Sequence, residues 1–283
     1  MRYTVKITAA AAAAAALTLG LSACSAPSDS DTSDGDKNAP LVVGATSAPH
    51  AEILNFVKAE LAKKHGLKLD VKEFDDYQLI NPATENGDLD ANFFQHKAYL
   101  DDFNKKQGTH IVPVVNVHIE PIGLYSKKHQ KLSELKAGSL IGIPDDVSNQ
   151  GRALNLLGDK GLIKLKSGVG ANAKLSDVKD SKGIKFREVK AGQIAPQLPD
   201  YDAAVINGNY AIAAKLKPSK DALALEPTKN NPYANFLAVK KGNESDPRVK
   251  KLAKLLNTAE VKKFIQDKYT DGSALPAFGP VQG

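Results

Sequence analysis

One stretch of the chain concentrates side chains that could do chemistry. Residues 92–100 (NFFQHKAYL) hold two Phe, one His and one Tyr, although only 6% of the chain is aromatic and it contains no Trp. Such a cluster could belong to the core, to a metal or catalytic site, or to the wall of a binding pocket. Taken alone, a core position is the commonest place for aromatic side chains.

The spacing inside this stretch divides its side chains between two faces. If a helix begins near Gln95, then His96, Tyr99 and Phe103 share its inner face. Phe94 then lies at the junction of a strand and this helix, beside any cleft. We expect His96 to be a neutral contact rather than a catalyst or a metal ligand. The residues expected to remain in the core are Phe93 and Leu100.

A second stretch places an arginine at the start of a predicted helix. In residues 144–154 a strand ends, a polar turn follows, and a helix begins with Ser148 or Asn149 as its cap. A helix N-terminus carries free N–H groups and positive dipole character. Arg152 is therefore unfavourable there unless an anion lies nearby. An exposed arginine that tolerates this penalty is the plain alternative, but a bidentate carboxylate clamp suits its type and place better.

A third stretch, residues 204–210, carries a strand into a helix through Asn and Gly. Asn207 stands at the carboxyl end of this strand, where open α/β sheets bind their ligands. Its amide can both donate to a carboxylate and accept from an ammonium group.

Catalytic and metal motifs are missing from the sequence. It contains no G-x-S-x-G elbow, no P-loop and no H-E-x-x-H motif. His118 and Glu120 share one face of a predicted strand and could ligate a metal together. The sequence does not indicate a third or fourth ligand. We therefore predict a protein that is not an enzyme and has neither a metal site nor a cofactor.

The N-terminus predicts export and a lipid anchor. Residues 1–23 combine a basic start with a short apolar run, which is typical of a secretory signal peptide. LSAC (21–24) follows, and Cys24 is the only cysteine of the chain. An ordinary signal peptide with an incidental cysteine is the alternative. Lipidation of Cys24, with acyl chains such as palmitate, explains its position better. Residues 24–40 are then the lipidated Cys and a disordered tether.

Charge argues against a nucleic-acid partner. Removal of residues 1–23 leaves 36 Lys and Arg residues against 32 Asp and Glu residues, a formal charge of +4. These charges are mixed along the chain rather than gathered into a basic stripe. We therefore expect no nucleic-acid partner. The predicted export signal and lipid anchor place the protein on the extracytoplasmic face of the cell membrane.

From residue 41 onward, β-like runs alternate with helical patterns, which predicts an α/β fold with mixed, mostly parallel sheets flanked by helices. Two comparable sets of strands and helices are joined by extended crossovers, which suggests two lobes. The prolines within residues 111–126 suit a sheet edge or a crossover.

Several motifs together resemble the NlpA/MetQ family of methionine-binding lipoproteins. They include LSAC, FQHKAYLD (94–101), IEPIGLYSKK (119–128), NQGRALNLL (149–157) and NPYANFLAV (231–239). The resemblance implies a two-lobed (type II) periplasmic-binding-protein-like fold with the ligand in the cleft between the lobes. It also implies delivery to an ABC importer made of a permease and an ATPase. The implied lobes are residues 41–123 plus 229–283, and residues 124–228.

The resemblance also implies a ligand site. Aromatic contacts around the ligand side chain are expected from Tyr77, Phe94, His96 and Tyr99. Arg152 matches the carboxylate-binding arginine, and Asn149, Asn207 and Asn235 match contacts to the amino-acid head group. The expected ligand is L-methionine, with D-methionine, a methionyl dipeptide or another small amino acid as alternatives, and the expected state is a monomer. An exported enzyme or adhesin on the same fold is the alternative of a different class.

Overall fold

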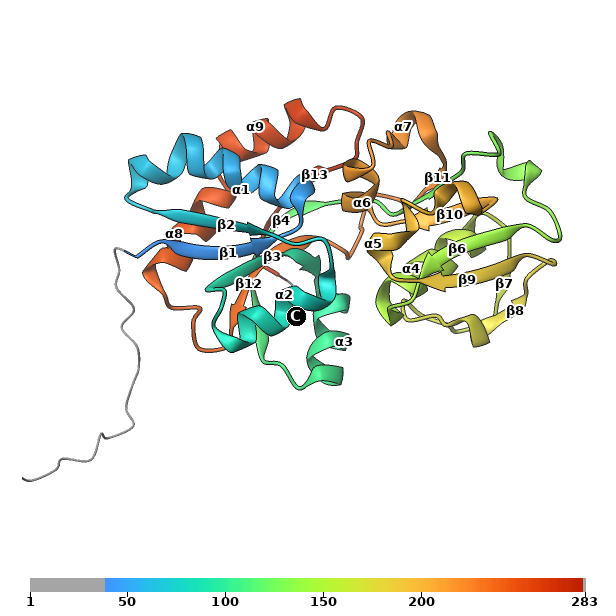
Figure 1. Cartoon of the computed structure of the whole chain (residues 1–283), viewed down its shortest axis with the longest axis horizontal. Helices are drawn as coiled ribbons and strands as arrows, with labels where there is room; N and C mark the ends of the chain where they lie inside the picture. The colour runs from blue at the N-terminus through green and yellow to red at the C-terminus, as the bar shows by residue number, and fades with distance from the viewer. Residues whose placement is uncertain (1–38, 282–283) are drawn as a thin grey trace, which may run out of the picture. The chain divides into compact units, whose positions relative to one another are not determined.

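Two large β-sheets organise the part of the chain that this computed structural model describes, residues 39–281 (Figure 1). The predicted signal peptide, Cys24 and nearly all of the predicted tether lie outside these residues. Within them, no helix is both long and apolar enough to cross a membrane.

The first sheet has six strands in the order β13-β4-β12-β3-β1-β2. It takes strands from both ends of the described chain, so its C-terminal part returns to complete what the N-terminal part begins. Its strands are β1 (Leu41–Ala45), β2 (Leu69–Glu73), β3 (Ala91–His96), β4 (Ile111–Ile119), β12 (Asn235–Lys240) and β13 (Leu275–Gly279).

The second sheet has five strands in the order β11-β5-β10-β6-β9, all from the middle of the chain. These strands are β5 (Gly123–Tyr125), β6 (Leu140–Pro144), β9 (Lys185–Val189), β10 (Ala203–Ile206) and β11 (Ala222–Leu225). A separate two-stranded ribbon pairs β7 (Lys164–Leu165) with β8 (Val178–Asp180). The chain crosses between the large sheets after β4 and again after β11. The exact lobe boundaries stay a prediction.

Both large sheets mix parallel and antiparallel pairs. Strand β1 runs parallel to β2 and β3, and β6 runs parallel to β9 and β10. The pairs of β12 with β3 and β4, of β13 with β4, and of β5 with β10 and β11 are antiparallel. The α/β class agrees with the prediction, but the parallel pairs do not outnumber the antiparallel ones. The two crossovers cause this, because each returns the chain in the opposite direction.

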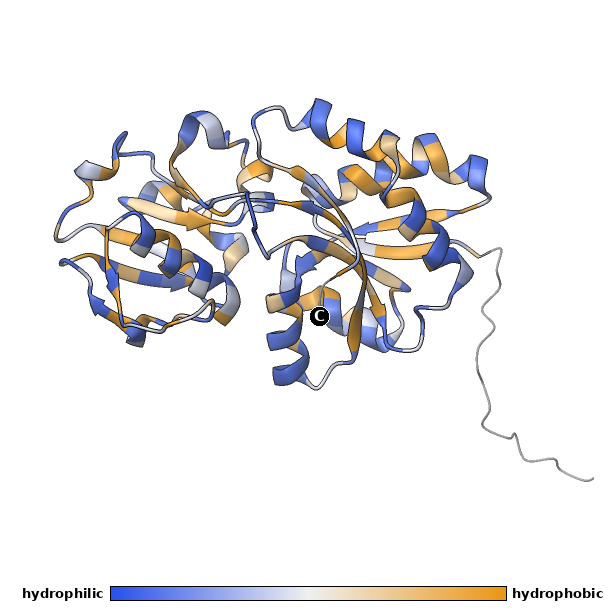
Figure 2. Cartoon of the chain, turned by 180° about the vertical axis from the view of Figure 1, so that it is seen from behind, coloured by the Kyte–Doolittle hydropathy of each residue, from blue (hydrophilic) through white to orange (hydrophobic). Residues whose placement is uncertain are grey.

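Helices cover both faces of the six-stranded sheet, and its strands are correspondingly apolar (Figure 2). One face packs against α1 (Glu52–Phe56), α8 (Pro247–Leu256) and α9 (Ala259–Lys268). The other face packs against α2 (Tyr77–Asn86) and α3 (Lys97–Gln107). Strand β3 is therefore buried along its whole length. Because side chains alternate along a strand, Phe93 joins the first helix layer and Phe94 the second.

The five-stranded sheet is covered in the same way. One face packs against α4 (Val147–Asp159), and the other against α5 (Ala191–Ile194) and α6 (Gly208–Ala213). The short helix α7 (Pro218–Asp221) precedes β11. The carboxyl ends of β6 and β10 thus lead directly into α4 and α6, which is how Arg152 and Asn207 reach the site described below.

Two local predictions need correction, and one helix was missed. Helix α3 begins at Lys97 rather than near Gln95, because the His96 side chain is its N-cap and accepts the backbone N–H of Tyr99 at 3.2 Å. The cap of α4 is Asp146 rather than Ser148 or Asn149, because its carboxylate accepts the Asn149 backbone N–H at 2.9 Å. Helix α2 was not predicted, since Pro82 lies inside it.

The prolines within residues 111–126 lie at a sheet edge and in a crossover, as predicted. Strand β13 pairs only with residues 116–119 of β4, so Pro113 has a neighbour on one side alone. A register shift in β12 accompanies it, between Leu237 and Ala238. Pro121 lies in the crossover between β4 and β5. Proline cannot donate to a sheet ladder, and both places spare it that bond.

Candidate ligand-binding site

All eight side chains predicted to bind a ligand line one cavity. They come from elements of both large sheets: α2, β3, α3 and β12 of the first, and α4 and the start of α6 of the second. The eight are Tyr77, Phe94, His96, Tyr99, Asn149, Arg152, Asn207 and Asn235, and the cavity is also lined by Gln95, Glu120, Gly208 and Asn209.

Aromatic rings form one side of the cavity. The ring centroid of Tyr77 lies 5.6 Å from those of Phe94 and Tyr99, and 4.9 Å from that of Tyr210. Tyr77 also donates its hydroxyl to Oδ1 of Asn209. Burial raises the pKa of Tyr77 well above its ordinary value, so this phenol is neutral. The rings therefore offer an uncharged, polarizable surface to a ligand.

His96 closes one end of this wall as a neutral imidazole. Its Nδ1 accepts from the Tyr99 backbone N–H, so its Nε2 carries the proton that is donated to Oδ1 of Asn149 at 3.2 Å. Burial, with the nearby charge of Arg152, lowers the pKa of His96 to about 3. These two bonds account for its role as a neutral contact. As the helix cap, Nδ1 must accept a hydrogen bond and carries no proton, and because the Asn149 carbonyl can only accept, the proton lies on Nε2.

Asn149 organises the polar end of the cavity. Its Oδ1 accepts from His96, from Nδ2 of Asn207 at 2.9 Å and from Nη1 of Arg152 at 3.5 Å. Its Nδ2 donates to both carboxylate oxygens of Asp146 at 3.0 Å. Both ends of this amide are thus used within the protein. Asn149 orients three neighbours and has little capacity left for a ligand.

Asn207 has an unpaired carbonyl oxygen at the cavity. Its Nδ2 donates one N–H to Asn149 and keeps the other, whereas its Oδ1 is buried and has no hydrogen-bond partner. The sequence interpretation gave this amide both a donor and an acceptor role. The acceptor role is the more strongly indicated, because an unpaired buried carbonyl is costly unless a donor meets it.

Arg152 is buried and already paired with a carboxylate. Its Nε and Nη2 lie 3.1 and 2.6 Å from the two carboxylate oxygens of Glu226, and its Nη2 also donates to the backbone carbonyl of Glu120 at 3.2 Å. Its guanidinium lies 4.1 Å from the ring centroid of Tyr233. The bidentate edge expected for a ligand is therefore occupied by Glu226. Nη1, which makes only the long contact to Asn149, is the group left to face the cavity.

Asn235 connects the cavity to a buried histidine. Its Oδ1 lies 3.1 Å from Nε2 of His50, and its Nδ2 donates to the backbone carbonyl of Tyr233 at 3.4 Å. An amide nitrogen has two N–H groups, so Nδ2 keeps one for a ligand.

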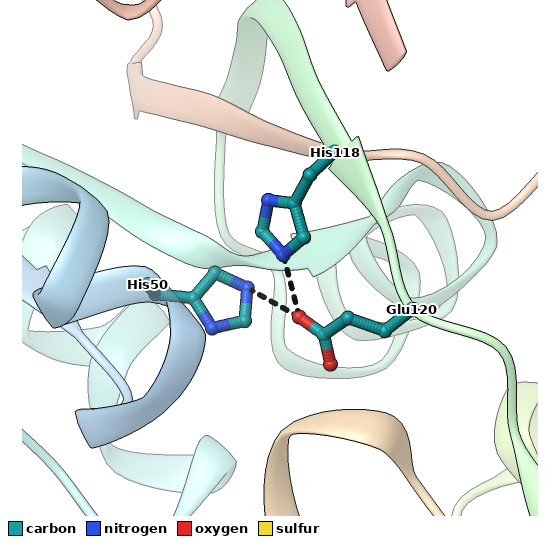
Figure 3. A group of neighbouring side chains, drawn as sticks. All are labelled: His50, His118 and Glu120. Carbon is teal, nitrogen blue, oxygen red and sulfur yellow. Dashed lines mark hydrogen bonds and ion pairs between the residues drawn. The ribbon is translucent and has the colours of Figure 1, made fainter. Parts of the chain in front are cut away.

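His50, His118 and Glu120 converge below the polar end, as Figure 3 shows. Nε2 of His118 lies 2.6 Å from Oε1 of Glu120, and Nε2 of His50 lies 3.3 Å from the same oxygen. The third metal-ligand candidate that the sequence did not indicate is thus His50. The absence of a metal site stays a prediction, because the His118 contact is also a normal hydrogen bond to a carboxylate, and Nε2 of His50 also meets Oδ1 of Asn235.

Burial governs the protonation of this cluster. It lowers the pKa of His50 to about 4 and that of His118 to about 3. It raises the pKa of Glu120, against the opposing effects of His50 and Arg152. Both histidines are therefore neutral near pH 7. The contact of His118 with Glu120 is a hydrogen bond rather than an ion pair.

Sequence reasoning missed several parts of the site. Glu226 directly follows β11, and a charged residue at a strand end was its only signal. His50 lies far from His118 in the chain, in the turn Ser47–Ala51 before α1, so no spacing rule could join them. Glu120 was considered only as half of a metal site. Tyr233 gave no signal beyond its place in the NPYANFLAV motif.

A family model described as NlpA lipoprotein matches residues 41–278, which is nearly the whole described chain. The chain belongs to the NlpA lipoprotein family.

Two of the similar proteins are named as methionine-binding lipoproteins. The chain is 42% identical over 246 residues to the methionine-binding lipoprotein MetQ of Bacillus subtilis, a match that covers 83% of this chain and 87% of the relative. It is 37% identical over 234 residues to the D-methionine-binding lipoprotein MetQ of Escherichia coli, covering 82% and 86%.

Solved structures agree with these matches. A nutrient binding protein from Burkholderia cenocepacia bound to methionine is 44% identical, with a TM-score of 0.80, and the match covers 84% of this chain and all of that one. The methionine binding protein MetQ is 36% identical, with a TM-score of 0.82, covering 87% of this NlpA-family chain and 100% of that one. The predicted two-lobed α/β fold class and family are confirmed.

Proposed function

We propose that this chain is a membrane-anchored solute-binding protein that captures methionine and delivers it to an ABC importer. The observation that carries the proposal is the cavity itself, in which an aromatic wall faces a polar end with both a spare cation donor and an unpaired carbonyl. A free amino acid needs these features together: a donor for its carboxylate, an acceptor for its ammonium group and a pocket for its side chain. The names of the relatives support the same ligand.

The roles follow from the groups left free. Nη1 of Arg152 and the spare N–H of Asn235 would meet the ligand carboxylate, and Oδ1 of Asn207 would accept from its ammonium group. Tyr77, Phe94, His96 and Tyr99 would surround the thioether, which gains about 0.3–1.5 kcal/mol from a good aromatic contact. Asn149 would hold these groups in place rather than bind the ligand.

The groups that line the cavity suit a single amino acid, and both L- and D-methionine are compatible with them. The proposed partners are an ABC permease and its ATPase, which would read the ligand-bound state. Lipid on Cys24 would anchor the monomer to the extracytoplasmic face of the membrane.

Mass spectrometry of the small molecule that co-purifies with the protein tests this proposal. Protein denatured after purification under native conditions should release methionine in near-stoichiometric amount. Release of a different amino acid or of a peptide in that amount would contradict the ligand assignment.

A further inference from the structure

Glu120 is a buried carboxylate at the edge of the cavity that has no cationic partner. Its side chain is only 5% exposed and lines the ligand site. Among the described residues, the groups that meet its carboxylate are the neutral histidines His118 and His50 and the backbone N–H of Asn209. Arg152 donates a hydrogen bond to the backbone carbonyl of Glu120, but its guanidinium forms its ion pair with Glu226. A buried charge without a counter-ion is costly.

The two histidines fix one oxygen of this carboxylate. Both Nε2 atoms lie beside Oε1 (Figure 3), His118 at 2.6 Å and His50 at 3.3 Å, and Nε2 of His50 also meets Oδ1 of Asn235 at 3.1 Å. The backbone N–H of Asn209 meets the same carboxylate. Oε2, which neither histidine contacts, has the capacity to meet a further donor.

Gly208 gives Glu120 its place beside the cavity. A Cβ at residue 208 would lie 2.5 Å from Cβ of Glu120 and 3.1 Å from its Oε2, so any larger residue would displace this side chain. The neighbouring residue is Asn207, whose Oδ1 is the unpaired buried acceptor of the site. An anionic acceptor and a neutral acceptor thus both line the polar end of the cavity, where Arg152 supplies the cation.

We propose that Glu120 is the counter-ion of the ligand's ammonium group and selects ligands with a free, protonated primary amine. An ammonium group has three N–H donors, and Oε2 of Glu120 with Oδ1 of Asn207 supplies two acceptors for them. The inference rests on the proposed function and extends it. It excludes N-acylated and desamino compounds that keep the thioether and the carboxylate.

A metal ion is the competing use of the same three side chains. Binding it would require Nε2 of both histidines to lose its proton, and would leave a proton on Nδ1 of His118, which is buried without a partner. It would also place a dication close to Arg152. The hydrogen-bonded arrangement has neither cost.

Calorimetry with L-methionine and its desamino analogue tests the inference. The wild-type protein should bind L-methionine roughly 30-fold or more tightly than the analogue, since removing one partner of a buried charge pair typically costs that much. Glu120→Gln replaces an anionic acceptor by a neutral amide of the same shape. This variant should lose most of that preference, through weaker methionine binding, while its affinity for the analogue changes less than about threefold.

Glu85→Gln is the matched control, because Glu85 is a partly buried carboxylate paired with Lys240 outside the cavity. It should keep the wild-type preference. A Glu120→Gln variant that folds and retains the wild-type preference would overturn the ammonium assignment alone, whereas a wild type that binds neither compound would overturn the proposed function as well. Binding of Zn²⁺ to the wild type that competes with methionine and is lost in Glu120→Gln would also contradict the inference.

Discussion

Glu226 holds Arg152 through both of its carboxylate oxygens, at 3.1 Å from Nε and 2.6 Å from Nη2. This pair keeps a buried guanidinium oriented. It also means that a ligand carboxylate meets an arginine whose charge is already partly balanced. The strength of ligand binding therefore depends on Glu226 as well as on Arg152.

Glu226→Gln should separate stability from affinity. In this variant buried Arg152 lacks its counter-charge, which should lower the free energy of unfolding of the ligand-free protein by about 1–3 kcal/mol. A bound ligand carboxylate should then raise this free energy by more than it does in the wild type. Thermal unfolding with and without methionine measures both effects. Glu73→Gln, at an exposed position of β2, should change neither. A smaller ligand-induced shift in Glu226→Gln than in the wild type would contradict this account.

Arg152→Ala should weaken methionine binding by at least about 2–3 kcal/mol, because it leaves the bound carboxylate without a cation. Calorimetry provides the measurement, with circular dichroism to verify folding. Arg187→Ala removes an exposed arginine of the same sheet and should leave the affinity unchanged. If Arg152→Ala binds as tightly as the wild type, the carboxylate is bound elsewhere.

Phe94→Leu should reduce the selectivity for a thioether. The wild type should prefer methionine to norleucine, which has the same shape without sulfur, by about 0.3–1.5 kcal/mol per aromatic contact. Phe94→Leu should reduce this difference in binding free energy between methionine and norleucine. Phe93→Leu changes the neighbouring residue, which packs on the opposite face of β3, and should lower stability while keeping the selectivity. Equal selectivity in wild type and Phe94→Leu would remove Phe94 from the thioether wall.

Three buried neutral histidines should make the protein acid-sensitive. Burial lowers the pKa of His50 to about 4 and those of His96 and His118 to about 3, from an ordinary value of 6.5. Below pH 6.5 the unfolded chain therefore binds protons that the folded protein does not. The free energy of unfolding should therefore decrease as the pH is lowered through this window, by up to about 1.4 kcal/mol per pH unit for each histidine.

Glu120 acts in the opposite direction, because its raised pKa lets the folded protein keep a proton that the unfolded chain loses above pH 4.5. The net effect is still destabilising, since three groups oppose one. Urea denaturation between pH 7 and pH 5 measures it. A stability that does not change over this range would show that these histidines are protonated in the folded protein.

Cys24→Ala should release the protein from membranes, because Cys24 is the predicted site of lipidation and the only cysteine available. Membrane fractionation of cells that express the full chain gives the answer. Ser25→Ala, at the next residue, should remain with the membrane. A Cys24→Ala protein that still sediments with membranes would mean that another part of the chain anchors it.

The sequence predicted the strands and the contents of the cavity better than the bonds within it. Period-two and helical patterns located most elements, and the family resemblance located eight of the twelve residues that line the cavity. The roles of Asn149 and Asn207 could not be predicted, because they depend on which end of each amide is already used. Glu226 and His50 reach the site through the crossover after β11 and the turn before α1. Contacts of this kind depend on the fold rather than on local spacing.

Direct titration of ligand-free protein with L-methionine tests the central claim. The protein should be refolded from denaturant to remove any bound molecule, and leucine should be titrated in parallel. We expect saturable 1:1 binding of methionine and at most weak binding of leucine. No heat with methionine, together with saturable binding of leucine or of a dipeptide, would contradict the proposed function.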